Sequence, residues 1–219
     1  MGNVTAYLKP TYYIDYNSPN VREKAEEFSL FDTEKRAQAI FYFVRDSVVY
    51  TPYSPFFLPE HYKASRILQR GSGYCVQKAV LLTALARANH IPARLVFANI
   101  KNYLIPEKLL KMMGTNVFIF HGYNELYIRE RWVKVTPTFN IEMCKKLSLQ
   151  PVEFDGHNDA TFHAYDLNGQ KHIEYTKDYG NFSDLPFETM MVNFEMQYSE
   201  DMLKRWKESA QDKPIGQHR

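Results

Sequence analysis

Residues 71–88, GSGYCVQKAVLLTALARA, decide the fold, because a glycine-rich segment runs directly into an apolar run. Nearly every position over 80–86 is apolar, and a helix that is apolar on most of its faces is usually buried in a protein core. The pattern therefore predicts a buried helix over 76–89, with Asn89 as a left-handed cap. Cys75 immediately precedes this helix, so its thiol is expected at the first helical turn.

This position favours Cys75 as a nucleophile. Unpaired N–H groups at a helix N-terminus carry about half a positive charge. A thiol placed there, beside an imidazolium, can have its pKa lowered to roughly 3.5–7.5, and the same N–H groups can stabilise an oxyanion. The sequence thus predicts a thiolate at neutral pH. Taken alone, a free cysteine is more often simply buried; Cys144, followed by two lysines, lacks this setting and is interpreted as structural.

A nucleophilic cysteine needs a base and then an acid, and histidine serves as both near neutral pH. His121 lies in residues 118–127, FIFHGYNELY, which read as a strand. Alternation puts four side chains on one face, namely His121, Tyr123, Glu125 and Tyr127. Gly122 is expected to leave room beside the imidazole. By itself a histidine in an apolar strand is more often a hydrogen-bonded core residue, so the inference depends on Cys75 and His121 together.

Working outward, the chain reads as an α+β protein with a helical first half followed by antiparallel strands. The predicted elements are helices over 33–48 (capped by Asp32 or Thr33), 63–68, 106–114 and 185–208, and strands over 94–100, 117–129 and 132–135, the last two joined through Glu130-Arg131. No repeat or low-complexity linker divides the chain. We therefore expect one domain over 1–219, with a core at about 33–140 and a C-terminal extension at about 141–219.

The composition is that of an ordinary globular protein. Hydrophobic residues make up 45% and charged residues 24% of the 219 residues, and the net charge of +2 is too small to imply nucleic acid or an anionic membrane as partner. No apolar run reaches 18 residues, residues 1–7 do not resemble a signal peptide, and two cysteines form no disulfide framework. A cytoplasmic location is the expectation.

Four segments, in this order, resemble the transglutaminase-like superfamily, which shares the papain-type cysteine-protease core. They are FVRDSVVY (43–50), GSGYC with LLTALARA and IPAR (within 71–94), HGYNELY (121–127) and WVKVTPT (132–138). The ordered set is much more specific than any single motif and lies within about 37–140. The resemblance implies a nucleophile helix packed on an antiparallel β-sheet, and a Cys–His–Asp triad.

Cys75 and His121 match the first two triad positions, but the third departs from the family. Thr136 stands where the family pattern has Asp before Pro-Thr. Threonine can accept a hydrogen bond from imidazole but supplies no negative charge, and an aspartate in this role can be worth about 10⁴-fold in kcat. Either Thr136 suffices, or Asp155 orients the imidazole instead, or the site is inactive. His90 also stands where the family usually has Gly, which bears on helix capping.

The resemblance implies acyl transfer or amide and peptide hydrolysis through a thioester on Cys75, with His121 as general base and acid. A peptide or carboxamide substrate is then expected, and no cofactor or metal. One alternative is an inactive binding or scaffold module. Another is a metal site formed by four residues whose spacing matches no standard zinc motif, His157, Asp159, His163 and His172. Residues 101–116 are either a lid or a surface helix, and the aromatic residues over 50–57 either line a groove or join the core.

Overall fold

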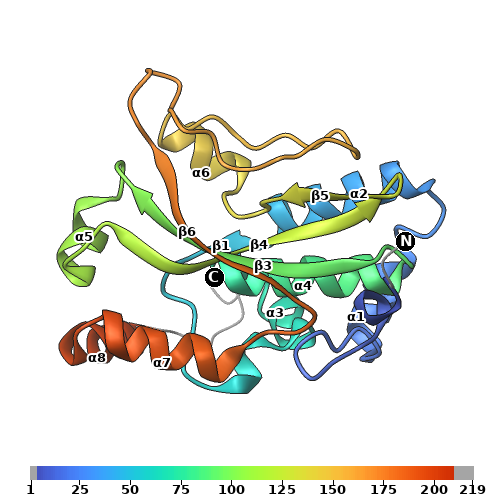
Figure 1. Cartoon of the computed structure of the whole chain (residues 1–219), viewed down its shortest axis with the longest axis horizontal. Helices are drawn as coiled ribbons and strands as arrows, with labels where there is room; N and C mark the ends of the chain where they lie inside the picture. The colour runs from blue at the N-terminus through green and yellow to red at the C-terminus, as the bar shows by residue number, and fades with distance from the viewer. Residues whose placement is uncertain (1–3, 210–219) are drawn as a thin grey trace, which may run out of the picture.

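The computed structural model describes residues 4–209 (Figure 1), so part of the N-terminal segment considered above lies outside the described residues. Its centre is a four-stranded antiparallel sheet in the order β5-β4-β3-β6. The strands are β3 (Ala93–Asn102), β4 (Val117–Ile128), β5 (Arg131–Val135) and β6 (Ile173–Phe182). The first three follow the prediction closely, whereas β6 was not predicted.

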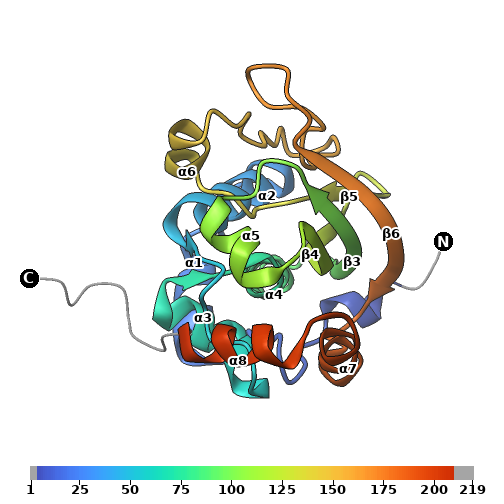
Figure 2. The ribbon, with the colours of Figure 1, turned by 90° about the vertical axis from the view of Figure 1, so that its left-hand side faces the viewer.

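One face of the sheet packs on α4 (Cys75–Ala88), in which every residue from Val76 to Arg87 is buried. Figure 2 looks along α4 and shows how the other helices surround it. The helices that pack on α4 are α1 (Pro19–Glu26), α2 (Thr33–Tyr42) and α3 (Ala64–Arg70). The predicted buried helix packed on an antiparallel sheet is therefore confirmed, and the fold is the α+β arrangement that the sequence indicates.

The helix ends differ from the prediction in two places. Asp32 caps α2 as expected, accepting a hydrogen bond from the Lys35 backbone N–H at 2.9 Å, but the α-helix changes to a π-helical turn, η2 (Phe43–Ser47). After α4 the left-handed residue is His90, with φ of 60°, and not Asn89. The Asn89 side chain instead donates to the carbonyls of Leu85 and Ala25. These hydrogen bonds hold Asn89 near helical geometry, so the left-handed residue that ends the helix comes one position later, at His90.

The C-terminal part of the chain covers both faces of the core. The predicted single helix over 185–208 is two helices, α7 (Phe187–Gln197) and α8 (Glu200–Ser209), separated where Tyr198 becomes extended. Before β6, the short helix α6 (Ile141–Lys146) packs beside η2. In the irregular segment 147–172, Ala160 bridges Val135 at the end of β5 and Phe162 packs on His121. Within 4–209, no helix combines the length and apolarity needed to cross a membrane.

Candidate active site

Cys75 is the first residue of α4, and the chain that leads to it is fixed on both sides. The two-residue strand β2 (Ser72–Gly73) pairs in parallel with β1 (Val49–Tyr50). At the helix start, the Gln77 side chain accepts from the Tyr74 N–H at 3.2 Å and donates to the Pro55 carbonyl at 2.7 Å. The thiol therefore projects from a backbone that has little freedom to move.

Burial, and not the helix terminus, dominates the electrostatics of this thiol. Cys75 is half-buried, and loss of hydration raises its pKa to about 11, although the backbone N–H groups of Gly122, Val76 and Cys75 itself act to lower it. The prediction of a thiolate at neutral pH is therefore wrong for this structure. The physical reason is that the thiolate loses more hydration free energy in apolar surroundings than it gains from hydrogen bonds to the three N–H groups.

His121 is placed by a bulge in β4. Ile100 pairs with Phe118 and Ala98 with His121, so β4 takes three steps where β3 takes two, and Phe120 adopts a left-handed φ of 51°. Such a bulge redirects the side chains that follow it. Asn124, three residues after His121, donates at 2.8 Å to Ala79 O on α4, so the alternate positions Tyr123 and His121 face the other side, as predicted.

The imidazole of His121 is enclosed by aromatic rings. Phe162, Tyr175 and Tyr123 lie with ring centroids 5.0, 6.0 and 6.2 Å from it, and the residue is only 1% exposed. Burial lowers the His121 pKa to about 3, which keeps the ring neutral. Its Nε2 atom is buried without a hydrogen-bond partner among the described residues. A buried, unpaired ring nitrogen is costly in a purely structural position.

Gly122 connects the two residues. The Gly122 N–H donates a hydrogen bond to the Cys75 thiol. A Cβ atom added to Gly122 would stand 2.9 Å from the Val76 Cα, so only glycine allows β4 to approach the start of α4 this closely. The space beside Gly122 is therefore used by the helix and not by the imidazole, in contrast to the expectation. The contact brings Cys75 and the strand position next to His121 into one small region.

The third triad position holds an uncharged group. Val135 pairs with Asn124, so Thr136 points to the sheet face that carries His121. Thr136 is 1% exposed, and its hydroxyl interacts with the side chain of Tyr175. The phenol of Tyr175, from β6, has its pKa raised to about 12 by burial, although the Thr136 hydroxyl and the Phe162 N–H counteract this. Tyr175 was missed from the sequence, because no periodicity marked β6.

Asp155 does not lie near His121. Its carboxylate accepts from the N–H groups of His157 and Asn158 at 2.9 and 2.7 Å, and these bonds lower its pKa to about 2. The adjoining His157 contacts Glu34, which binds Arg129 beyond the far end of β4. Arg129 is eight residues from His121, which is roughly 26 Å of strand. The structure therefore gives no support to Asp155 as the group that orients the imidazole.

This geometry can be compared with known proteins. The family model described as "Transglutaminase-like superfamily" matches residues 21–137, more than half of the chain, and includes Cys75, His121 and Thr136. The chain belongs to the transglutaminase-like superfamily. No curated protein matches it.

One solved structure supports the fold, and two others share a smaller part of the chain. A candidate cysteine protease from Cytophaga hutchinsonii aligns over 91% of this chain at 18% identity, with a TM-score of 0.51. The periplasmic domain of TgpA from Pseudomonas aeruginosa, solved alone and with ethylmercury, aligns over 60% at 21% and 22% identity, with TM-scores of 0.42 and 0.41. The transglutaminase-like chain spans about half the length of these proteins, with 51%, 45% and 46% of them covered.

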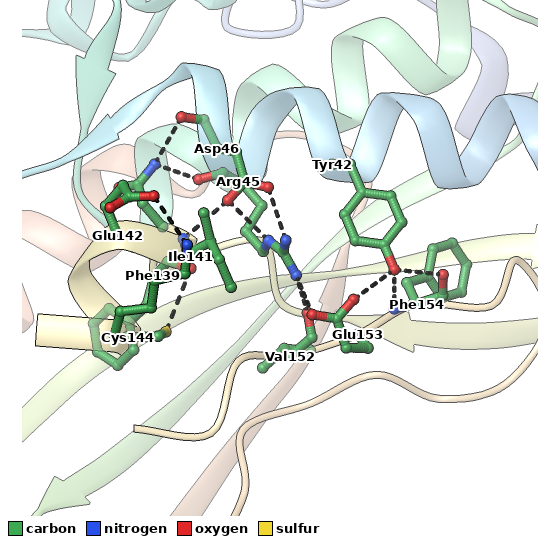
Figure 3. A network of polar contacts seen from close by, with 12 residues as sticks. Tyr42, Arg45, Asp46, Phe139, Ile141, Glu142, Cys144, Val152, Glu153 and Phe154 are labelled. Carbon is green, nitrogen blue, oxygen red and sulfur yellow. Dashed lines mark hydrogen bonds and ion pairs between the residues drawn. The ribbon is translucent and has the colours of Figure 1, made fainter. Parts of the chain in front are cut away.

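A buried polar network holds the segment after β5 against η2 (Figure 3). Arg45 binds Asp46 and Glu153 at 2.8 and 3.0 Å, and Asp46 accepts from the Ile141 N–H at 2.9 Å. Behind it Asn140 donates to three backbone carbonyls and accepts from the Tyr50 N–H. The network thereby ties the segment that carries Thr136 to the strand that precedes the cysteine loop.

Lys78, one turn after Cys75, is fully buried and belongs to the same region. Its Nζ donates to the carbonyls of Arg45 and Val48 at 2.9 and 2.7 Å, and burial lowers its pKa well below the usual value. Cys144 is also buried, and burial raises its pKa to about 11. Its sulfur lies 4.0 Å from the Phe139 carbonyl, in keeping with a structural role.

The four residues of the alternative metal site do not gather. His157 contacts Glu34 and Asp155, His163 faces the Pro151 carbonyl at 3.3 Å, and His172 packs against Phe139. Over the part of the chain that the structure describes, no three His, Cys, Asp or Glu residues come together as a metal-binding group. This structure therefore gives the metal hypothesis no site.

Two hollows adjoin the candidate site. An apolar cavity of about 30 Å³ borders Cys75 and is walled in part by α5 (Glu107–Met113), so the 101–116 insertion covers the thiol. The aromatic residues over 50–57 have two different roles: Tyr50 lines this cavity, and Phe56 is fully buried in the core.

On the other sheet face, a polar groove of about 460 Å³ passes Tyr123 and Tyr175, the ring neighbours of His121. A depression of about 730 Å³ between α1 and α3 includes none of these residues.

Proposed function

We propose that this transglutaminase-like protein is a cysteine-dependent enzyme that forms a thioester on Cys75 and uses His121 as general base and acid. The observation that carries the proposal is the contact at Gly122, where one backbone N–H reaches the Cys75 thiol and the adjoining residue is a buried histidine with an unpaired ring nitrogen. Both groups rest in their neutral forms.

The reaction begins when a substrate carbonyl reaches the sulfur. Sulfur attacks the carbonyl carbon as its proton passes to His121, because an isolated thiolate is unfavourable at this position. The N–H groups of Gly122 and Val76 are placed to stabilise negative charge on sulfur or on the carbonyl oxygen. His121 then gives the proton to the departing amine, and the C–N bond breaks to leave a thioester.

The second half of the reaction releases the acyl group. Water or an amine attacks the thioester, its proton passes through His121, and the Cys75 thiol is regenerated. We favour hydrolysis of a peptide or carboxamide, because water is always available and no amine site is evident. The polar groove beside Tyr123 and Tyr175 ends at two ring neighbours of His121 and brings water close to that residue.

One observation favours a second candidate, an inactive binding or scaffold module. The Nε2 atom of His121 makes no hydrogen bond among residues 4–209, and Thr136 provides no charge to stabilise an imidazolium. With the thiol pKa near 11 and the imidazole pKa near 3, proton transfer between them is uphill in the resting protein. Fold alone does not decide between the two candidates.

Acylation by p-nitrophenyl butyrate at pH 8, followed by intact-protein and peptide mass spectrometry, separates these candidates. We expect a butyryl adduct on Cys75 that is lost in Cys75→Ala and retained in Cys144→Ala. His121→Asn should slow acylation by about 10²–10⁴-fold, as for loss of a general base. Acylation of the His121→Asn variant at the wild-type rate would favour the inactive module.

A further inference from the structure

The cavity beside Cys75 is apolar on every side. Leu109, Met112 and Met113 of α5 form one wall, and Phe194 of α7 with Met202 and Trp206 of α8 form another. Among residues 4–209, no Asp, Glu, Lys, Arg or His side chain lines it. A charged group brought into such a cavity would lose its hydration without gaining a partner.

Three polar groups in these walls already have partners. The Tyr74 hydroxyl bonds to that of Tyr62 at 2.6 Å, and the Tyr198 hydroxyl accepts from the Ile119 N–H at 3.1 Å. The Trp206 indole N–H donates to the Pro52 carbonyl at 2.5 Å. These residues therefore present aromatic and aliphatic surface to a group that enters the cavity.

We propose that the acyl group carried by Cys75 is small, apolar and uncharged, and that it occupies this cavity. The inference rests on the proposed function, since it concerns the acyl half of the same thioester. A volume of about 30 Å³ accommodates one or two water-sized groups. The three lining methionines, Met112, Met113 and Met202, have flexible unbranched side chains that can move for a longer chain.

Aryl esters test this preference directly. In each reaction the Cys75 sulfur forms a bond to the acyl carbon, the ester C–O bond breaks, p-nitrophenolate leaves, and the thiol proton passes to His121. We compare the acetate, the butyrate and the hemisuccinate, which has a four-carbon acyl chain ending in a carboxylate. Each acylation rate is divided by the rate of the same ester with free N-acetylcysteine, which removes differences in intrinsic reactivity.

After this correction, butyrate is expected to react about 15-fold faster than acetate, since it carries two more methylenes and each buried methylene contributes about fourfold. Hemisuccinate is expected to react at least about 50-fold more slowly than butyrate. Met112→Lys places a cation at the cavity wall and should raise the hemisuccinate-to-butyrate ratio at least about tenfold. The matched control Met196→Lys, on α7 at a residue that is 82% exposed and outside the cavity lining, should leave the ratio unchanged.

The outcomes separate the two proposals. Hemisuccinate reacting as fast as butyrate, with the adduct on Cys75, would overturn the apolar preference and leave the proposed enzyme intact. An unchanged ratio in Met112→Lys, while that variant still forms the butyryl adduct, would show that this cavity does not hold the acyl group. A folded protein that forms no adduct on Cys75 with any of the three esters would overturn both.

Discussion

At the scale of single residues, the proposed nucleophile and the proposed base are both kept in their uncharged forms by burial. The Cys75 pKa is raised to about 11 and the His121 pKa lowered to about 3, and the cause is desolvation in each case. A family aspartate would stabilise the imidazolium and hence the thiolate, but Thr136 cannot. The resting chemistry is therefore set by what surrounds the pair as much as by the pair itself.

The thiol pKa predicts a specific pH dependence. Below the pKa the thiolate fraction rises tenfold per pH unit, so iodoacetamide labelling of Cys75 should rise about tenfold per unit from pH 7 to pH 10. Mass spectrometry of the Cys144→Ala variant follows the single remaining thiol. A rate that levels off below pH 8 would instead indicate the preformed thiolate that the helix terminus alone suggests.

Restoring the carboxylate at position 136 should change this behaviour. Thr136→Asp places a negative charge on the sheet face that carries His121, which favours the imidazolium and lowers the thiol pKa. We expect at least about tenfold faster labelling of Cys75 at pH 7, together with a lower melting temperature because the carboxylate is buried. Thr136→Asn, the uncharged control, should label like the wild type. Equal labelling of both variants would mean that position 136 does not act on the imidazole.

The residues of the site differ in how visible they are from the sequence. Cys75 and His121 could be found because each stands in a local pattern, a glycine-rich helix start and an alternating strand. The raised pKa of Cys75 could not be predicted from the sequence, because it depends on the apolar cavity walls that α5 and α8 supply, and both helices are distant from Cys75 in the sequence. Tyr175 could not be predicted, because the sequence of β6 shows little alternation of apolar and polar residues and most of its side chains are exposed or half-buried.

At the scale of elements, Asn140 joins the segment after β5 to the region around η2. It makes four hydrogen bonds to backbone groups, three as donor and one as acceptor. Asn140→Ala should lower the free energy of unfolding by about 2–4 kcal/mol, because it leaves buried backbone groups with fewer partners. Denaturant unfolding measures this. Asn158→Ala, at an exposed loop residue, is the control and should cost under about 1 kcal/mol.

Local sequence patterns do not predict all the boundaries of the helices and strands. The β4–β5 turn lies at Arg129 and Glu130, both with left-handed φ, one residue before the predicted pair. Two left-handed residues match the twist of a tight hairpin, and the sequence offered no Asn-Gly or Asp-Gly to mark them. The break between α7 and α8 was equally hidden, because Tyr198 is positioned by a bond from Ile119 on β4.

At the scale of the whole molecule, two buried imidazoles make stability depend on pH. Burial lowers the pKa of His121 to about 3 and that of His172 to about 4. Between these values and the unfolded value of about 6.5, the unfolded chain binds more protons, so stability is complete above pH 6.5 and falls as pH drops. From pH 7 to pH 5 each histidine should cost about 2 kcal/mol.

Urea unfolding at the two pH values checks this dependence. His121→Gln and His172→Gln should each remove about half of the difference between pH 7 and pH 5, whatever their effect at pH 7. A wild-type protein whose unfolding free energy is the same at both pH values would contradict the neutral, buried state of these rings.

The long pairing of β6 with β3 has a practical consequence. The region that matches the family ends at residue 137, yet the outer edge of β3 is paired only by a strand that begins at Ile173. A chain ended at residue 140 would expose that edge as a row of open backbone donors and acceptors, which recruits strands from other molecules. The region that matches the family is thus shorter than the piece expected to fold alone, and expressing it by itself should yield aggregates.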